Sequence, residues 1–237
     1  MIKLFRNIRQ NLIAQGKTTN YIKYAIGEIV LVVIGILIAL QINTWNENRK
    51  EKVFEKKVLS ELYMDVKEDI KEMNSALNSL NESQNSSRII VQQLRNKQMY
   101  HDSLDKHFSY ALKLWSLSPN TTSFDMAKAE GMYFIKNDSI RFYISKVNGY
   151  HLDYVRVLEN RFQDYMSNVV LPHIQPIFDS YNFNAMKPND YDTLMKDTTY
   201  IGIIKSIHEM RERYIKMIED RYILLEKLHD MLKNEIE

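Results

Sequence analysis

The pattern of hydrophobic and polar positions changes abruptly along this chain. Ile29–Leu40 reads IVLVVIGILIAL, a run without a polar side chain, and apolar and aromatic residues extend it on both sides. Crossing ~30 Å of hydrocarbon takes about 20 mainly apolar residues, and a helix from Tyr24 to Trp45 would rise roughly 32 Å. We therefore predict a transmembrane helix over residues 21–45, with Tyr21, Tyr24 and Trp45 as aromatic anchors at the membrane interfaces.

Two alternatives to a membrane anchor remain open. A cleaved signal peptide has an apolar region of about 7–15 residues, which this run also satisfies. However, no small-x-small cleavage site follows Leu40, and the preceding segment Met1–Glu28 is long for the start of a signal peptide. We favour an uncleaved anchor over a cleaved signal, and over the second alternative, a buried helix of a soluble protein.

The apolar run gives way to a heptad pattern. Ile36–Ser118 contains neither glycine nor proline, so nothing forces the helix to stop at the membrane edge. Two interleaved seven-residue repeats are typical of a packed helix. One comprises Leu59, Val66, Met73, Leu80 and Leu94, and the other Tyr63, Ile70, Leu77 and Val91. The polar segment Asn81–Ser87 interrupts both repeats, which indicates either a break in the helix or polar side chains on its packed face.

Capping residues and periodicity predict four further helices. These start at Asp102 or Ser103, Ser123, Asn137 and Tyr200, and end near Trp115, Gly131, Pro172 and Asn234. For the third, Gly149 is a candidate kink, and the expected core face is Ile140, Ile144, Val147, Tyr154, Leu158, Phe162 and Val169. For the last, it is Ile203, Ile207, Met210, Tyr214, Met217, Leu224, Leu228 and Met231.

These elements predict an all-α protein. Asp179–Thr199 is expected to be a long loop, and Met132–Ile135 is the one segment whose pattern suggests a strand. The expected architecture is an N-terminal transmembrane helix that continues into an elongated helical bundle over residues 46–237.

Charge gives the predicted membrane helix a direction. Met1–Gly27 contains no acidic residue, whereas all 30 acidic residues lie from Glu28 onward. The basic residues of this segment are Lys3, Arg6, Arg9, Lys17 and Lys23. The positive-inside rule then predicts a cytoplasmic N-terminus and an outer C-terminal domain. The absence of cysteine fits an oxidising compartment.

The basic residues also explain the sequence pI of 8.5. Residues 1–20 combine helically spaced apolar and basic side chains, which is typical of an amphipathic leader lying on anionic lipid. A disordered basic tail is the alternative. We therefore expect the lipid bilayer as a partner and no binding to nucleic acid.

Two features inside the predicted membrane helix suggest contacts with other chains. Glu28 is ionisable, and such residues are functional candidates by default in membranes; its position near Lys23 also fits a role at the interface. Gly35 and Ala39 form a small-xxx-small pair, with Gly27 near the same face, which favours close helix packing in lipid. We expect a homo-oligomer, a complex with another envelope protein, or both.

The sequence shows no pattern of catalysis or metal binding. His101, Asp102, Asp105 and His107 cluster, but without the HExxH spacing, and a solvated helix start explains them better. His151 is expected to be a hydrogen-bonded core histidine. A glycine-rich phosphate loop, a GxSxG elbow and a cysteine nucleophile are all absent from the sequence. We therefore expect no enzymatic activity and no cofactor.

Four Asp-Ser/Thr motifs resemble the periplasmic O-glycosylation site of Bacteroidota. Their acceptor residues are Ser103, Ser139, Thr193 and Thr198. Helix capping is the alternative explanation, because Asp, Ser and Thr are favoured at helix starts.

Two segments carry a resemblance to a known family. Gly16–Lys50, GKTTNYIKYAIGEIVLVVIGILIALQINTWNENRK, resembles the N-terminal signature of an uncharacterised family of single-pass inner-membrane proteins of Bacteroidota. Phe124–Ser145, FDMAKAEGMYFIKNDSIRFYIS, is similar to a second block of that family. The resemblance implies an inner-membrane location and a periplasmic helical domain, and it supplies no activity.

The function expected from these patterns is that of a non-enzymatic structural or interaction subunit, anchored by residues 21–45 and self-associating through that helix and its heptad continuation. A periplasmic ligand-sensing bundle is one alternative. An accessory subunit of an ion-driven or transport complex that uses Glu28 is another.

Overall fold

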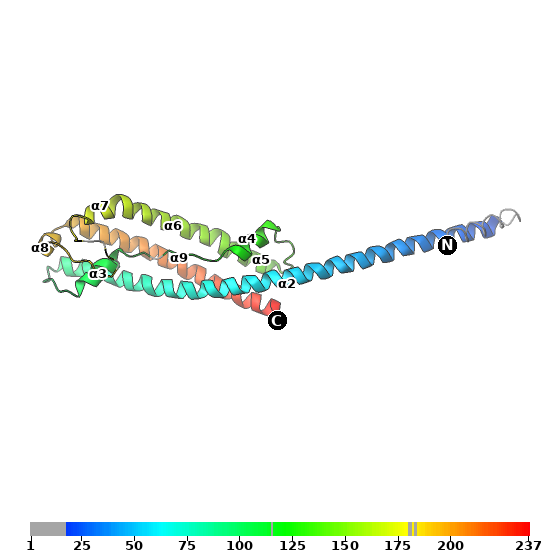
Figure 1. Ribbon diagram of the computed structural model, residues 1–237, viewed down its shortest axis with the longest axis horizontal. Coiled ribbons are helices and arrows are strands. Elements are labelled where there is room, and N and C mark those ends of the chain that lie inside the picture. Colours follow the sequence, from blue (N-terminus) through cyan, green and yellow to red (C-terminus); the bar gives the residue numbers. More distant parts are fainter. Residues whose placement is uncertain (1–17, 115, 180–181, 183) are drawn as a thin grey trace. The chain divides into compact units, whose positions relative to one another are not determined.

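The computed structural model describes residues 18–114, 116–179, 182 and 184–237, and its regular elements are all helices (Figure 1). The predicted all-α class, with a long apolar N-terminal helix, is confirmed. The described residues contain no strand, and the candidate strand Met132–Ile135 was wrong. Gly131 (φ 79°) and Met132 (φ 60°) adopt left-handed conformations there, which turn the chain. The predicted leader falls largely on residues 1–17, outside the described residues.

Helix α2 (Thr18–Arg95) contributes to two compact units, Met1–Glu55 and Lys56–Glu237. It is 78 residues long and unbroken across Asn81–Ser87. Of the two alternatives for that segment, the continuous helix with polar side chains on its packed face is the one observed.

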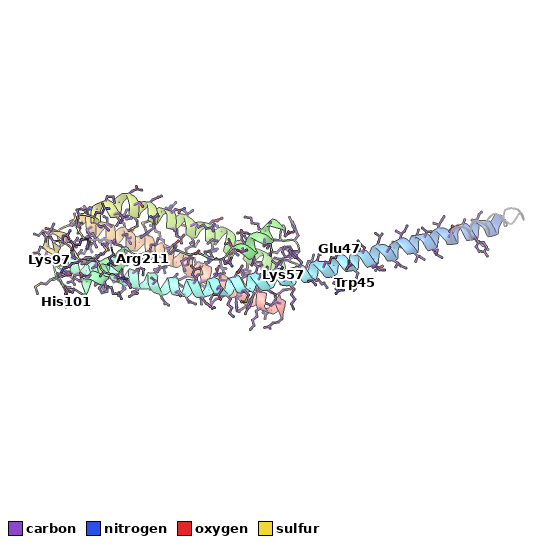
Figure 2. The ribbon with its side chains drawn as sticks, in the orientation of Figure 1. Trp45, Glu47, Lys57, Lys97, His101 and Arg211 are labelled. Atoms are coloured by element: carbon purple, nitrogen blue, oxygen red, sulfur yellow. The ribbon has the colours of Figure 1, made fainter. Side chains whose placement is uncertain are left out.

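The described residues of the first unit form a helix with apolar side chains exposed on all sides. Ile29, Leu31 and Trp45 are 64%, 62% and 65% exposed, and side chains project around the whole helix near Trp45 and Glu47 (Figure 2). Its most apolar 18-residue window has a mean hydropathy of 2.6, and none of that window is buried. A helix of this length and composition could be a membrane anchor.

The second unit combines the C-terminal part of α2 with the other helices. These are α3 (Leu104–Leu112), α4 (Thr122–Ala129), α5 (Asp138–Ser145), the π-helical segment η1 (Lys146–His151), α6 (Leu152–Tyr165), the π-helical segment η2 (Met166–Val170), α7 (Leu171–Ile174), α8 (Tyr191–Leu194) and α9 (Thr198–Ile236). Helices α3, α5 and α6 all contact α9, which is the central element of this unit (Figure 1).

Asparagine and aspartate side chains cap three of these helices. Asn137 Oδ1 accepts hydrogen bonds from the backbone N–H groups of Ser139 and Ile140 at the start of α5, as predicted. Asp190 caps α8 and Asp197 caps α9 in the same way. Each carboxylate or amide oxygen satisfies N–H groups that have no partner within the helix.

Two π-helical segments correct the predicted core face of the third helix. Tyr154 and Val169, both expected in the core, are 43% and 42% exposed, whereas their neighbours Val155 and Val170 are fully buried. A π turn inserts one extra residue into the helix, and each residue rotates the following face by about 100°. The predicted kink residue, Gly149, lies within η1.

The packed face of α2 is also shifted from the prediction. The first repeat, Leu59 to Leu94, is buried as expected, but the second lies at the half-buried edge. The second buried line is instead Leu62, Asp69, Ala76, Ser83 and Ile90. Two polar residues and an alanine hid this line from a search for apolar repeats. Since both lines are buried within the chain, the heptads of α2 pack against its own second unit.

The buried apolar residues of the second unit form two hydrophobic clusters, and the half-buried Leu114 packs against both. One includes Leu80 of α2 and Tyr214 of α9, and the other includes Ile90 of α2 and Ile207 of α9. The residues between them, Ser83–Ser87 on α2 and Arg211 on α9, are polar. We call this group the polar layer.

Candidate functional site

Arg211, labelled in Figure 2, makes the hydrogen bonds that hold the polar layer together. Its side chain is fully buried on α9. One terminal nitrogen donates to Ser87 Oγ at 2.8 Å and to the carbonyl oxygen of Ser83 at 3.1 Å. The other donates to the carbonyl oxygens of Ala111 at 2.8 Å and Lys113 at 2.9 Å. One guanidinium group thus joins α9 to α2 and to the C-terminal end of α3.

The compensation of this buried charge comes from dipoles. Among the described residues, no carboxylate forms an ion pair with Arg211, although burial of an unpaired charge is costly. Ala111 and Lys113 present the free carbonyls at the end of α3, where the helix dipole is negative. Desolvation lowers the pKa of Arg211 to about 10, so the guanidinium stays charged at neutral pH. Its Nε is buried without a hydrogen-bond partner.

The serines and glutamine of α2 explain why this layer is polar. Ser87 Oγ accepts from Arg211 while its own hydroxyl lies within reach of the carbonyls of Ser83 and Ala111. Gln84 accepts weakly from Arg211, at 3.5 Å, and donates to the carbonyl of His208 at 3.1 Å. Three residues of the segment that interrupts the heptads, Ser83, Gln84 and Ser87, therefore bind one arginine.

A second buried arginine, Arg221, lies further along α9 in the other core. Its side chain is fully buried and donates to Asp69 Oδ2 of α2 at 2.9 Å, where Asp69 is also buried. The pKa of Asp69 is raised by burial, an effect that the charge of Arg221 opposes. The side chain of His151 is 7% exposed, and its Nδ1 has no hydrogen-bond partner. Its core-facing position was predicted correctly, and the predicted hydrogen bond is not made through Nδ1.

Next to the polar layer lies an open cleft of about 250 Å³ between α2 and α9. We call it the α2–α9 cleft; its lining residues are Ser87, Arg88, Val91, Gln92, Lys205 and His208. Ser87 belongs to both the cleft and the polar layer, so the floor of the cleft contacts Arg211 directly.

The structure does not bring the predicted site residues of the apolar segment together with these groups. Gly27, Gly35 and Ala39 lie on the exposed surface of α2 in the first unit, as do Lys23, Tyr24 and Trp45. Glu28 is half-buried there and takes part in interactions. The side chain of Tyr21, and the basic residues Lys3, Arg6, Arg9 and Lys17, lie outside the described residues.

The histidine and aspartate cluster at the start of α3 has local partners. His101 contacts Ser103 and is exposed, while His107 Nδ1 lies 3.0 Å from Ser86 Oγ. Tyr100 donates to Asp105 Oδ1 at 2.5 Å. Within the part of the chain that the structure describes, no three His, Asp or Glu side chains are placed to hold a metal ion.

The four predicted glycosylation residues are exposed and lie at helix starts. Ser103 is the residue before α3 but makes no capping hydrogen bond, and Ser139 is capped by Asn137 rather than acting as a cap. Thr193 donates to Asp190 at 2.6 Å, and Thr198 follows the capping residue Asp197. Modification at these positions stays a prediction.

The fold and its sites define an all-helical protein with a helix that could anchor it in a membrane and two buried arginines in its helical domain. The chain belongs to a family of unknown function (DUF6090), whose model matches residues 28–209. The match includes the Ser83–Ser87 side of the polar layer. No curated protein and no solved structure matches the chain. The expected membership of a family of unknown function is confirmed; its bacterial group and membrane location stay predictions.

Proposed function

We propose that this chain is a bitopic inner-membrane protein whose periplasmic helical bundle acts as a non-enzymatic structural or interaction subunit. The observation that carries the proposal is the fully exposed apolar helix of the first unit, with its mean hydropathy of 2.6. In water this surface would be strongly unfavourable, at roughly 25 cal/mol per Å² of apolar area. Lipid removes that cost.

The proposed direction of insertion has the N-terminus in the cytoplasm, and the basic segment Met1–Gly27 supports it under the positive-inside rule. The self-association we propose is confined to the membrane helix, since the heptads of α2 are already buried within the chain. Gly35 and Ala39 are the candidate contact, because a Cβ added at Gly35 meets no other atom within 4 Å and small residues let two helices approach closely.

Single-cysteine variants test both the direction of insertion and the self-association, since the native sequence has no cysteine. A membrane-impermeant maleimide should label Lys97→Cys in cells with a permeabilised outer membrane, and label Lys17→Cys after the inner membrane is opened. Equal labelling of the two before opening would refute the topology.

Oxidation of native membranes should give a disulfide-linked dimer of Ala39→Cys. The matched control is Leu37→Cys, two residues away and about 200° around the helix, which should cross-link much less. If neither variant cross-links, or both do so equally, the Gly35–Ala39 contact is wrong.

A further inference from the structure

The α2–α9 cleft carries positive charge without a neighbouring acid in its lining. Arg88 of α2 and Lys205 of α9 both line it, and His208 lies one turn beyond Lys205 on α9. None of the six lining residues is acidic. Among the described residues, neither Arg88 nor Lys205 forms an ion pair, although several lysines elsewhere on α2 do so.

The buried Arg211 adds a third fixed positive charge behind the cleft floor. It donates to Ser87, which lines the cleft, and its charge lowers the pKa of His208, after the larger effect of burial and together with Arg88. Because Arg211 is compensated by carbonyl dipoles and lacks a carboxylate partner, its field extends toward the cleft. Charge of one sign focused in a partly desolvated cleft concentrates ions of the other sign.

Two acidic residues affect His208 without lining the cleft. Glu209 and Glu212 partly offset the lowering of the His208 pKa. Both line a different groove along α9, together with Arg213 and Lys216. The charges that line the cleft are therefore those of Arg88 and Lys205, with His208 as the titratable member and Arg211 buried behind Ser87.

We propose that the α2–α9 cleft is a binding site for a small oxyanion, a carboxylate or a phosphate. Arg88 and Lys205 would hold the anion from two helices, the Gln92 amide would donate a hydrogen bond from the rim, and Val91 would contact an apolar part of the ligand. A volume of about 250 Å³ is below the ~300–1,000 Å³ typical of pockets for larger ligands. The ligand is therefore a small one.

Such an anion would stabilise the contact between α2 and α9. Without it, Arg88 and Lys205 repel each other and Arg211 across this contact. With it, charge-assisted hydrogen bonds link the two helices. Binding to the folded state alone then raises the stability of the folded protein as ligand is added. This inference concerns the helical domain and does not depend on the proposed membrane topology.

The test is the thermal stability of the full-length chain in detergent, titrated with inorganic phosphate, inorganic sulfate or acetate. Sodium chloride at matched ionic strength is the reference. We expect a saturable rise in Tm with at least one anion. Saturation by phosphate and sulfate alone assigns a tetrahedral ligand, whereas saturation by acetate assigns a carboxylate.

Arg88→Gln and Lys205→Gln should each weaken binding by roughly ten-fold, since one charged hydrogen bond contributes about that factor. The matched control is Lys67→Gln, an exposed position on α2 that lines no part of the cleft. It removes the same charge and should leave the affinity unchanged. The Tm of each variant without ligand establishes that it is folded.

A dependence on pH gives a second readout. Since the pKa of His208 is lowered from 6.5, the ring is neutral at neutral pH and gains its charge on acidification. The affinity for sulfate, which does not itself titrate in this range, should rise as the pH falls below about 6.5, and should not rise in His208→Gln. The proposal is overturned if no anion stabilises the chain beyond sodium chloride, or if Lys67→Gln weakens binding as much as Arg88→Gln and Lys205→Gln.

Discussion

Arg211 and Arg221 occupy buried positions on α9 that heptad periodicity assigns to apolar side chains. Their surroundings differ: Arg211 is held by carbonyl oxygens, and Arg221 by the carboxylate of Asp69. A buried ion pair is weak evidence for stability, because desolvation offsets the attraction. Breaking it on one side is costly, however, because a charge is then left alone in the core.

We predict that Arg221→Met destabilises the folded protein by about 3–5 kcal/mol, since Asp69 would stay buried without its partner. The double variant Asp69→Leu with Arg221→Met should recover most of this loss, because it removes both charges. Chemical denaturation of the full-length chain measures both effects.

The control for the Asp69–Arg221 pair is Lys71→Met. This variant breaks the exposed pair between Lys71 and Glu68 on α2, the helix that also carries Asp69. Exposed pairs contribute little, so this variant should be nearly as stable as the native chain. A double variant as unstable as Arg221→Met alone would show that the pair does more than neutralise charge.

At the scale of single residues, the sequence predicted apolar residues of the core and missed its buried polar residues. Leu59, Val66 and Ile207 were identified because their hydrophobicity repeats. Asp69, Ser83 and Arg211 were missed because a charged or hydroxyl side chain is normally solvated, and only its three-dimensional partner makes burial tolerable. The sequence signal for these residues was the interruption of the heptads at Asn81–Ser87. It indicated where polar side chains lie on the packed face of α2, but not that Arg211 of α9 binds them.

At the scale of elements, the two π-helical segments decide which side of the long α5–α7 helix faces the core. Periodicity extrapolated from Ile140 and Ile144 was correct up to Val147 and wrong at Tyr154, beyond η1. A one-residue insertion into a helix has no signature in composition, since it is stabilised by the packing of residues such as Val155 against distant elements.

The Asn137 cap was predictable, whereas Ser123, a predicted cap, lies inside α4. Beyond η1 the predicted core face was correct at Phe162 and wrong at Tyr154 and Val169.

Deleting Gly149 tests the register directly. Because a π turn holds one residue more than an α-helical turn, removal of Gly149 should convert η1 to an α-helical turn and leave the following residues facing as they do now. Val155 should then stay in the core and Tyr154 stay exposed, and we expect a loss of less than about 1.5 kcal/mol in stability, below the cost of displacing one buried apolar side chain.

The companion variant is Gly149→Ala. A Cβ at Gly149 meets no atom within 4 Å, and alanine is favoured over glycine in helices by about 1 kcal/mol. This change should raise the Tm slightly. A deletion that costs more than about 3 kcal/mol, as the displacement of several apolar side chains would, would show that η1 does not hold one extra residue.

For the whole molecule, histidines give the helical domain a defined response to pH. The pKa values of His107, His151 and His208 are all lowered, with burial as the largest cause. Between their lowered values and the ordinary value of 6.5, the unfolded chain binds more protons than the folded one. Stability is therefore fully present above about pH 6.5 and is lost as the pH falls below it.

The measurement is the Tm of the ligand-free protein across this range. We expect the Tm to fall on acidification, and to fall less in His151→Gln, whose ring lies beside Arg221 and Lys146 and is opposed only by Asp220 among the groups that affect its pKa. A Tm that is flat below about pH 6.5, or the same slope with His151→Gln, would contradict this account.

The polar layer has a further consequence for how the helical domain opens. Apolar contacts on the two sides of Arg211 belong to different clusters, so each half retains its own buried surface when the other is disrupted. Local opening in proteins occurs in contiguous cooperative groups, and the layer is a natural border between two of them. Slow amide exchange should therefore separate into two kinetic classes that meet at Arg211, so that one end of the domain can fluctuate while the other stays closed.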